Sequence, residues 1–320
     1  MASTLLCELD RLGPDAAAAG TSPTYSASSA AEYTRRLVNT QYENFSVVSF
    51  VAPKRLRQDF ANVYAFCRWA DDLGDETGDR QQSLDLLAWW QDELEACYAG
   101  RTRHPVYVAL SKTIEKHDIP MKPFADLIDA FVQDQRVVRY ETWEQVLDYC
   151  TRSADPVGRL VLYLCGYRDA ERQTLSDATC TALQLVNFWQ DVRRDIVERD
   201  RIYVPAEDLH AERLTHEMLV GHVNGTQPMK LWQHSAYRRV IRTLVDRTAP
   251  LFERGRALWP LLADDVRLSI QLFTLGGESI AQAIRQLDYN TLEHRPSLSK
   301  AAKLMLMGRV LAAKYVGAPV

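Results

Sequence analysis

Apolar residues recur at helical spacing along most of the chain, and no convincing succession of alternating strands is present. Representative runs are Leu84-Leu87-Trp90-Leu94, Phe124-Leu127-Ile128-Phe131 and Ile270-Phe273-Ile280-Ile284-Leu287. Residues three or four apart lie on one face of an α-helix, so each run predicts an amphipathic helix with a buried side. The fold expected from this pattern is all-α.

Glycine and proline residues interrupt the helical pattern and divide the chain into about ten predicted helices. Residues 1–30 are rich in Ala, Ser, Gly and Thr, and they predict a poorly ordered N-terminal tail. Residues 31–320 contain no Gly/Ser linker and no repeat of fixed period, so we expect them to form one all-helical domain.

Composition excludes several classes of protein. The 320 residues are 47% hydrophobic with a formal net charge of −4, an ordinary globular balance with no basic face for nucleic acid. The six cysteines include no CxxC pair, which is typical of reduced thiols in a cytoplasmic protein. We expect neither a membrane-spanning helix nor a signal peptide, because the chain lacks a long apolar run and its N-terminus lacks a basic region.

Two segments place oxygen-bearing side chains four residues apart. The first contains Asp71 and Asp75, and the second contains Asn187, Asp191 and Asp195. On helices, side chains at this spacing lie one above the other, so each segment forms a ladder of oxygen atoms on one face. Stacked carboxylates repel one another unless a cation neutralises them.

Magnesium is the cation that these ladders fit best. It prefers oxygen ligands, retains several waters and typically binds one or two carboxylates together with substrate phosphates. Two ladders that converge would therefore hold a diphosphate through Mg²⁺. The alternative is that both are solvated helix faces, since acidic clusters on helices are common.

A polar residue stands near the start of each ladder. Arg68 precedes Asp71 by one turn, where it can donate a charge-assisted hydrogen bond to a phosphate oxygen. Its alternative is an intrahelical ion pair with Asp71, Asp72 or Asp75. Gln184 is in phase with Asp191, and its alternative, like that of Asn187, is a hydrogen-bonded buried amide.

The order and spacing of these residues resemble the motifs of the squalene/phytoene synthase family of head-to-head isoprenoid synthases. The resemblance covers about residues 33–310. Its motifs are Tyr64-x-x-x-Arg68-x-x-Asp71-Asp72-x-x-Asp75-Glu76, Gln184-x-x-Asn187-x-x-x-Asp191-x-x-x-Asp195 and Arg201-Ile-Tyr203-Val-Pro205. The finer likeness is to bacterial hydroxysqualene synthases of hopanoid biosynthesis, and it is carried by Glu43-Asn44-Phe45, by residues 149–158 and by Asn187-Phe-Trp-Gln190-Asp191. Carotenoid-type members usually have Tyr in place of Thr151 and Arg in place of Gln190.

The resemblance implies a single-domain helical bundle around a central apolar cavity, with the two ladders at its mouth. It implies a Mg²⁺-dependent enzyme that converts presqualene diphosphate and water to hydroxysqualene and diphosphate. The alternative within the family condenses two prenyl diphosphates, such as farnesyl diphosphate, to presqualene diphosphate, squalene or phytoene.

The family also implies roles for individual residues. Arg201 and Tyr203 correspond to a flap over the diphosphate, with a surface turn as the alternative, and Gln190 falls among the substrate-binding positions. Tyr64, Phe45 and Tyr289 are candidates to face the carbocation or simply to pack. Asn44, Thr151 and Asp155 are candidates to position the attacking water, or they are hydrogen-bonded core residues; Arg295 would add positive charge at the mouth.

Functions typical of other classes of protein have less support. A non-catalytic helical scaffold is disfavoured because both ladders are intact. The seven histidines show no metal-binding motif, so we expect them to form no metal cluster, which disfavours a di-metal oxidase. The apolar substrate favours peripheral contact with the inner membrane surface and with enzymes of the same pathway.

Overall fold

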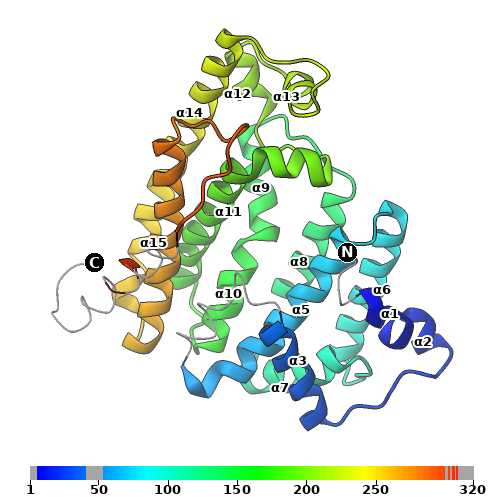
Figure 1. The fold of residues 1–320 in the computed structure, drawn as a ribbon. Helices are drawn as coiled ribbons and strands as arrows, with labels where there is room; N and C mark the ends of the chain where they lie inside the picture. The colour runs from blue at the N-terminus through cyan, green and yellow to red at the C-terminus, as the bar shows by residue number, and fades with distance from the viewer. Residues whose placement is uncertain (1–5, 41–52, 300–301, 303–304, 307, 309–320) are drawn as a thin grey trace. The chain divides into compact units, whose positions relative to one another are not determined.

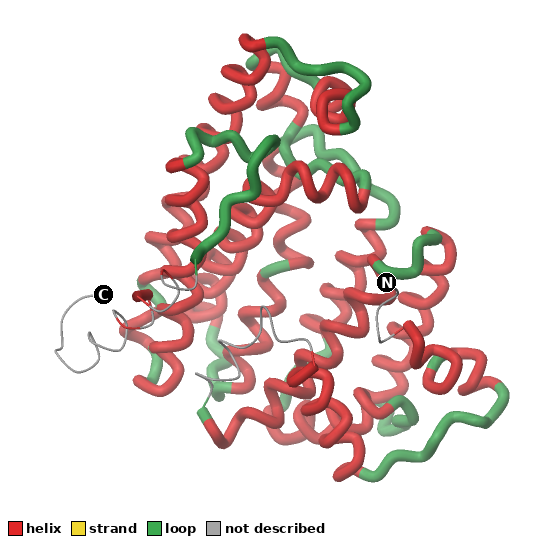
Figure 2. The backbone as a smooth tube through the Cα atoms, in the orientation of Figure 1, coloured by secondary structure: helices red, strands yellow, loops and turns green. Residues whose placement is uncertain are grey.

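Helices account for nearly all regular structure in the part of the chain that the computed structural model describes, residues 6–40, 53–299, 302, 305, 306 and 308 (Figures 1 and 2). Those residues contain no β-strand, only an isolated parallel bridge between Arg139 and Ile202. The all-α class expected from the sequence is therefore confirmed. The chain groups into two compact units, residues 1–136 with 156–169 (unit 1) and residues 137–155 with 170–320 (unit 2).

Unit 1 is organised around helix α5 (Arg57–Asp75), which packs against four other α-helices of the unit and the short η2. Its helices are η1 (Leu6–Glu8), α1 (Leu9–Leu12), α2 (Pro14–Ala18), α3 (Ala27–Thr40), η2 (Lys54–Leu56), α5, α6 (Arg80–Tyr98), α7 (Pro105–His117) and α8 (Lys122–Asp134). Phe66 and Trp69 of α5 are fully buried and stack on Trp90 of α6 at ring distances of 5.9 and 5.5 Å. Because this aromatic core buries one face of α5, the opposite face of the helix points away from the core.

The N-terminal region differs from the poorly ordered tail that its composition predicts. Residues 6–18 form η1, α1 and α2, and Leu12 is 3% exposed. Leu12 lines a small cavity together with Trp89 and His104, and Glu8 accepts a hydrogen bond from the hydroxyl of Tyr33. A few apolar side chains and one part-buried hydrogen bond thus order a segment whose small residues alone would not.

Unit 2 is organised around α11 (Ala170–Arg199), a helix of 30 residues. Its other helices are α9 (Trp143–Ser153), α12 (Ala206–Ala211), α13 (His216–Val223), α14 (Leu231–Arg256), η3 (Trp259–Leu261) and α15 (Asp264–Gln286); α10 (Asp155–Leu164) starts in unit 2 and continues in unit 1. Glycines let α14 and α15 approach α11 closely. A Cβ added at Gly255 would lie 2.0 Å from Thr179 Oγ1, and one at Gly277 would lie 2.4 Å from Leu183 Cδ2.

After α15 the chain turns back and runs along α11 (Figure 1). The side-chain amide of Gln190 donates to the carbonyl of Pro296 at 2.7 Å, and Arg193 donates to the carbonyl of Leu292 at 3.3 Å. We call residues 289–298 the return segment. It brings the end of unit 2 alongside the second ladder.

None of the described helices combines the length and the apolar character needed to cross a bilayer.

Candidate active site

The first ladder lies on the face of α5 opposite the aromatic core. Tyr64, Arg68, Asp71 and Asp75 follow one another at intervals of four, three and four residues, so they form one stripe along the helix. All four are partly exposed, whereas the neighbouring Trp69 is fully buried. Packing of unit 1 therefore leaves this stripe at the surface of the unit.

Arg68 pairs with acidic groups of its own helix. One guanidinium nitrogen lies 3.0 Å from Asp71 Oδ2, and the other contacts Asp72, whose side chain is 1% exposed. The intrahelical ion pair that the sequence left open is thus present in the described structure. Arg68 nevertheless remains 23% exposed, so a guanidinium already oriented beside the ladder stays accessible to a phosphate.

Tyr64 and Cys67 lie in the same region of α5. Burial raises the pKa of Tyr64, partly offset by the charge of Arg68, and it raises the pKa of Cys67 to about 12. Both side chains are therefore neutral near pH 7. Neither adds charge to the ladder, and Tyr64 presents an uncharged aromatic ring one turn before Arg68.

The second ladder lies on α11. Gln184 and Asp191 are partly buried, Asn187 is exposed, and Asp195 is buried with 8% exposure. Burial, followed by the charge of Asp191 one turn earlier, raises the pKa of Asp195 to about 7. A raised pKa of this kind means that poor solvation and the neighbouring negative charge both disfavour ionisation of the Asp195 carboxyl.

The Asp191 carboxylate is held by Arg295 of the return segment. Arg295 Nε lies 2.6 Å from Oδ1 and its second nitrogen lies 3.1 Å from Oδ2, which is a bidentate pair. Arg194 lies farther away, at 3.9 Å. Arg295 thus lies at the ladder, where the family pattern suggests added positive charge.

The donor set of the ladders fits Mg²⁺. Each contributes oxygen atoms from side chains spaced one turn apart, and neither brings the sulfur or imidazole ligands that softer metals prefer. Asp71 and Asp75 would be the ligands on α5; Asn187, Asp191 and Asp195 would be those on α11. An arginine already neutralises part of each ladder, which shows that positive charge is stabilised at both places.

Aromatic rings lie beside the second ladder. Phe188 shares the helical stripe of Gln184 and Asp191, and Tyr203 stacks on it with ring centroids 3.8 Å apart and planes 10° from parallel. Tyr203 is 8% exposed and Arg201 is 6% exposed. The segment after α11 is therefore packed against the helix in this structure, unlike a solvated surface turn.

Two further candidates have structural partners in unit 2. Gln190 is buried, and its amide holds the return segment through Pro296. Tyr289 has a positive φ of 59°, and the guanidinium of Arg242 lies 4.9 Å from its ring centroid.

The three residues considered for the attacking water differ in their surroundings. Asp155 is buried and accepts a hydrogen bond from Thr181 Oγ1 at 2.8 Å. Thr151 is exposed and donates its hydroxyl to the carbonyl of Asp148 at 2.6 Å, which is the local hydrogen bond typical of threonine in a helix. Asn44 lies outside the described residues, as does Phe45.

The expectation that no histidines gather with other metal-binding groups is corrected by the structure. His222, His234 and Glu293 come from three segments, and their nearest ligand atoms lie within 4.8 Å of one another. Sequence spacing gave no sign of this cluster, because folding alone brings the three segments together.

A scan against family models matches residues 38–302 to squalene/phytoene synthase. This chain belongs to the squalene/phytoene synthase family. Among curated members, hydroxysqualene synthase of Rhodopseudomonas palustris is 34% identical over 84% of this chain and 86% of its own length. The hydroxysqualene synthase of Zymomonas mobilis is 31% identical over 83% and 86%, and the phytoene synthase of Thermus thermophilus is 29% identical over 89% and 93%.

Solved structures of this family have the same fold. A squalene synthase from Alicyclobacillus acidocaldarius superposes with a TM-score of 0.74 at 45% identity, covering 82% of this chain and 96% of that one. A dehydrosqualene synthase superposes with a TM-score of 0.77 at 24% identity, covering 90% and 98%. The chain is an all-helical isoprenoid synthase of the kind that acts on prenyl diphosphates.

Proposed function

We propose that this protein is a hydroxysqualene synthase, which converts presqualene diphosphate and one water molecule to hydroxysqualene, diphosphate and a proton. In this reaction the C–O bond to diphosphate breaks with its electron pair, the cation rearranges, and water forms the new C–O bond. The observation that carries the proposal is a pair of oxygen-bearing helix faces, on α5 and α11, each with an arginine already bound to it.

The curated relatives support this reaction, since two hydroxysqualene synthases are 31% and 34% identical to the chain. The structure at 45% identity is named as a squalene synthase, which supports the condensing alternative. Phytoene synthases follow closely, at 29% identity for the Thermus thermophilus protein. Condensation of two prenyl diphosphates to presqualene diphosphate, squalene or phytoene is therefore the alternative.

Diphosphate departs when its growing negative charge is taken up. Mg²⁺, when bound, would supply the Lewis-acid share of that stabilisation and orient the phosphate oxygens. Arg68 and Arg295 would supply charge-assisted hydrogen bonds, since each guanidinium is partly exposed beside its ladder. We propose that both ladders act on the same diphosphate, with Gln184, Arg201 and Tyr203 binding beside the second ladder.

The cation formed on ionisation needs surroundings that stabilise it and exclude unwanted water. The stacked rings of Phe188 and Tyr203 offer an aromatic surface beside the α11 ladder, and Tyr64 offers one beside the α5 ladder. A hydroxysqualene synthase must still admit one water. Asp155 is the better-supported group to orient it, because its carboxylate is buried and fixed by Thr181, whereas Thr151 is exposed.

The decisive experiment incubates the purified protein and Mg²⁺ with presqualene diphosphate or with farnesyl diphosphate, each with and without NADPH. We expect hydroxysqualene from presqualene diphosphate without any reductant, and no requirement for NADPH. Turnover of farnesyl diphosphate alone would overturn the proposal in favour of the condensing enzymes. No turnover of either, with intact fold, would favour a scaffold.

Membrane contact is proposed on a separate observation. Leu231 and Trp232 begin α14 and are 89% and 48% exposed, next to the exposed Lys230. A leucine and a tryptophan beside a lysine are side chains that enter the headgroup region of a bilayer. We expect L231S/W232S to weaken sedimentation with anionic vesicles, while V197S, which alters another exposed apolar residue, leaves it unchanged.

A further inference from the structure

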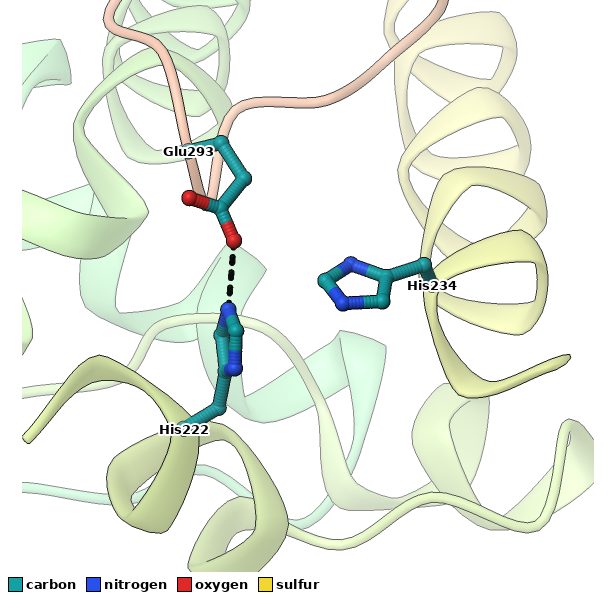
Figure 3. Close-up of side chains that lie close together, drawn as sticks. All are labelled: His222, His234 and Glu293. Atoms are coloured by element: carbon teal, nitrogen blue, oxygen red, sulfur yellow. Dashed lines mark hydrogen bonds and ion pairs between the residues drawn. The ribbon is translucent and has the colours of Figure 1, made fainter. Parts of the chain in front are cut away.

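His222, His234 and Glu293 lie together in unit 2 on the side of α13 and α14 (Figure 3). His222 is near the end of α13, His234 is in the first turn of α14, and Glu293 belongs to the return segment. The ring of His234 points from its helix toward the other two side chains. None of the three belongs to the ladders on α5 and α11.

The spacing of the three side chains suits a shared ligand. His222 Nε2 lies 2.5 Å from Glu293 Oε1, and one ligand atom from each residue lies within 4.8 Å of the others. The two imidazole rings have centroids 5.0 Å apart and planes 87° apart, so their edges do not block one another. His234 and Glu293 are not buried, which leaves both free to make the small rotations that would bring their ligand atoms to bonding distance.

The chemistry of the donors selects the kind of ion. Two imidazole nitrogens and a carboxylate oxygen, with room for water, are ligands typical of zinc and similar divalent transition metals. Mg²⁺ prefers oxygen ligands alone. We propose that His222, His234 and Glu293 bind a divalent transition metal ion of the zinc type, at a site separate from the Mg²⁺ ladders.

A proton is the competitor of that ion. The backbone N–H of Met229 donates to His222 Nδ1 at 3.1 Å, so in the neutral ring the proton sits on Nε2 and is donated to Glu293. A metal ion takes the place of this proton: Nε2 gives its proton to solvent, Nδ1 takes one up, and the Met229 N–H loses its acceptor. Two hydrogen bonds of His222, the one from the Met229 N–H and the one to the Glu293 carboxylate, are thereby exchanged for the bonds of His222 and Glu293 to the ion, and the net charge of the ring is unchanged.

The ion would join three segments that are far apart in sequence. Arg295 follows Glu293 by two residues, so an ion bound to Glu293 would restrain the return segment near the point where Arg295 binds Asp191. This consequence concerns a structural site and does not depend on the proposed reaction. Zinc binding can accordingly be measured without turnover.

The test uses the full chain, stripped by a chelator and kept in excess Mg²⁺, with Zn²⁺ as the probe in equilibrium dialysis. We expect one Zn²⁺ per chain that is lost with H234A and weakened at least tenfold with E293Q. His294 is the matched control, because it is an exposed neighbour outside the cluster, and H294A should bind like the unaltered chain. E293Q preserves the shape of the side chain, so the zinc affinity of this variant still tests the proposal if H234A fails to fold.

Two further readouts separate this site from other zinc-binding groups. Co²⁺ in place of Zn²⁺ should give a visible spectrum without thiolate bands, and nitrogen NMR should show the His222 proton on Nδ1 after metal binding. The proposal is overturned by absence of saturable binding, by wild-type affinity in both H234A and E293Q, or by an equal loss in H294A. Turnover in Mg²⁺ alone, measured on the same samples, reports separately on the proposed function.

Discussion

Arg295 binds both carboxylate oxygens of Asp191, at 2.6 and 3.1 Å, although the two residues are 104 positions apart in the sequence. The carboxylate so held belongs to the ladder that we assign to Mg²⁺. The pair raises the pKa of Arg295, first through the hydrogen bond to Asp191, so the guanidinium stays charged throughout the physiological range. Under the proposed function, a metal ion and this arginine would compete for one carboxylate, or would share it with the diphosphate.

The first prediction concerns that competition. Arg295→Gln removes a positive charge from Asp191, so we expect the Mg²⁺ concentration for half-maximal activity to fall by about 1.5- to 5-fold, the range given by a partly exposed ion pair of about 0.2–1 kcal/mol. Maximal turnover should fall as well, because diphosphate loses a donor. A Mg²⁺ titration of initial rates measures both effects.

Arg285→Gln is the matched control for Arg295→Gln. Arg285 pairs with Asp246 at 3.3 Å between α15 and α14, and the two are partly exposed like the first pair. Its Mg²⁺ titration should coincide with that of the unaltered enzyme. Half-saturation in Arg295→Gln that is unchanged or higher would show that Arg295 does not compete with the ion.

The second prediction concerns the ladders themselves. Asp71→Asn and Asp191→Asn each keep side-chain shape and remove a charged ligand, so we expect kcat to fall by about 100-fold or more, equivalent to about 2.7 kcal/mol of barrier. Thermal midpoints should stay close to that of the unaltered protein. Rates and calorimetry on the same preparations measure both quantities.

The double variant asks whether the ladders serve one diphosphate. If they do, the combined loss should be smaller than the product of the single losses, since groups that act as a unit are not additive. Asp85→Asn, at an exposed position on α6, is the control and should retain full activity. Independent, fully multiplicative losses would contradict joint action of the two helices.

The ladders were accessible to sequence reasoning because helical periodicity is local. Once α5 and α11 are recognised as helices, the spacing of Asp71 and Asp75, or of Asp191 and Asp195, places each pair on one face without knowledge of any other segment. The family resemblance rested on the same local spacings. The structure keeps each ladder on a partly exposed stripe of its helix, apart from Asp195, which is buried.

Contacts between distant segments were not accessible in that way. The Arg295–Asp191 distance and the gathering of His222 with His234 and Glu293 depend on how the return segment packs, which no local spacing encodes. Ordering of residues 6–18 was missed for a related reason. Composition describes how little a segment can bury, but not which of its side chains pack, and here Leu12 and Ala16 are buried while Glu8 accepts a hydrogen bond from Tyr33.

The third prediction concerns pH and the stability of unit 1. Asp59 is buried on α5; burial alone would raise its pKa, but hydrogen bonds from Lys116, His117 and Thr113 outweigh it, so the pKa lies below its ordinary value. A carboxyl with a lowered native pKa stabilises the fold above its unfolded pKa and loses that effect as pH falls toward the native value. We expect Asp59→Asn to lower the free energy of unfolding by about 2 kcal/mol at neutral pH.

The sign of the pH effect makes this prediction specific. The difference between Asp59→Asn and the unaltered protein should narrow below about pH 4, near the pKa of an unfolded aspartate. Urea unfolding at neutral pH and at steps below about pH 5 measures it. Asp126→Asn, in the exposed pair with Lys122, is the control and should change stability by less than about 1 kcal/mol. A difference that widens at low pH would contradict the assignment.

The last prediction separates two candidates for the residue that orients water. Asp155 is buried and fixed by Thr181 Oγ1 at 2.8 Å, whereas Thr151 is exposed and its hydroxyl is bound to a backbone carbonyl. Asp155→Asn should therefore lower hydroxysqualene formed per diphosphate released by about tenfold, the loss of about 1.4 kcal/mol. Thr151→Val should leave that ratio unchanged.

Product analysis beside a diphosphate assay gives the ratio directly. Thr181→Val removes only the hydrogen bond to Asp155, so its ratio should fall between those of Asp155→Asn and Thr151→Val. An unchanged ratio in Asp155→Asn would show that the carboxylate only supports the fold, because a structural loss lowers total turnover without shifting the partition between products.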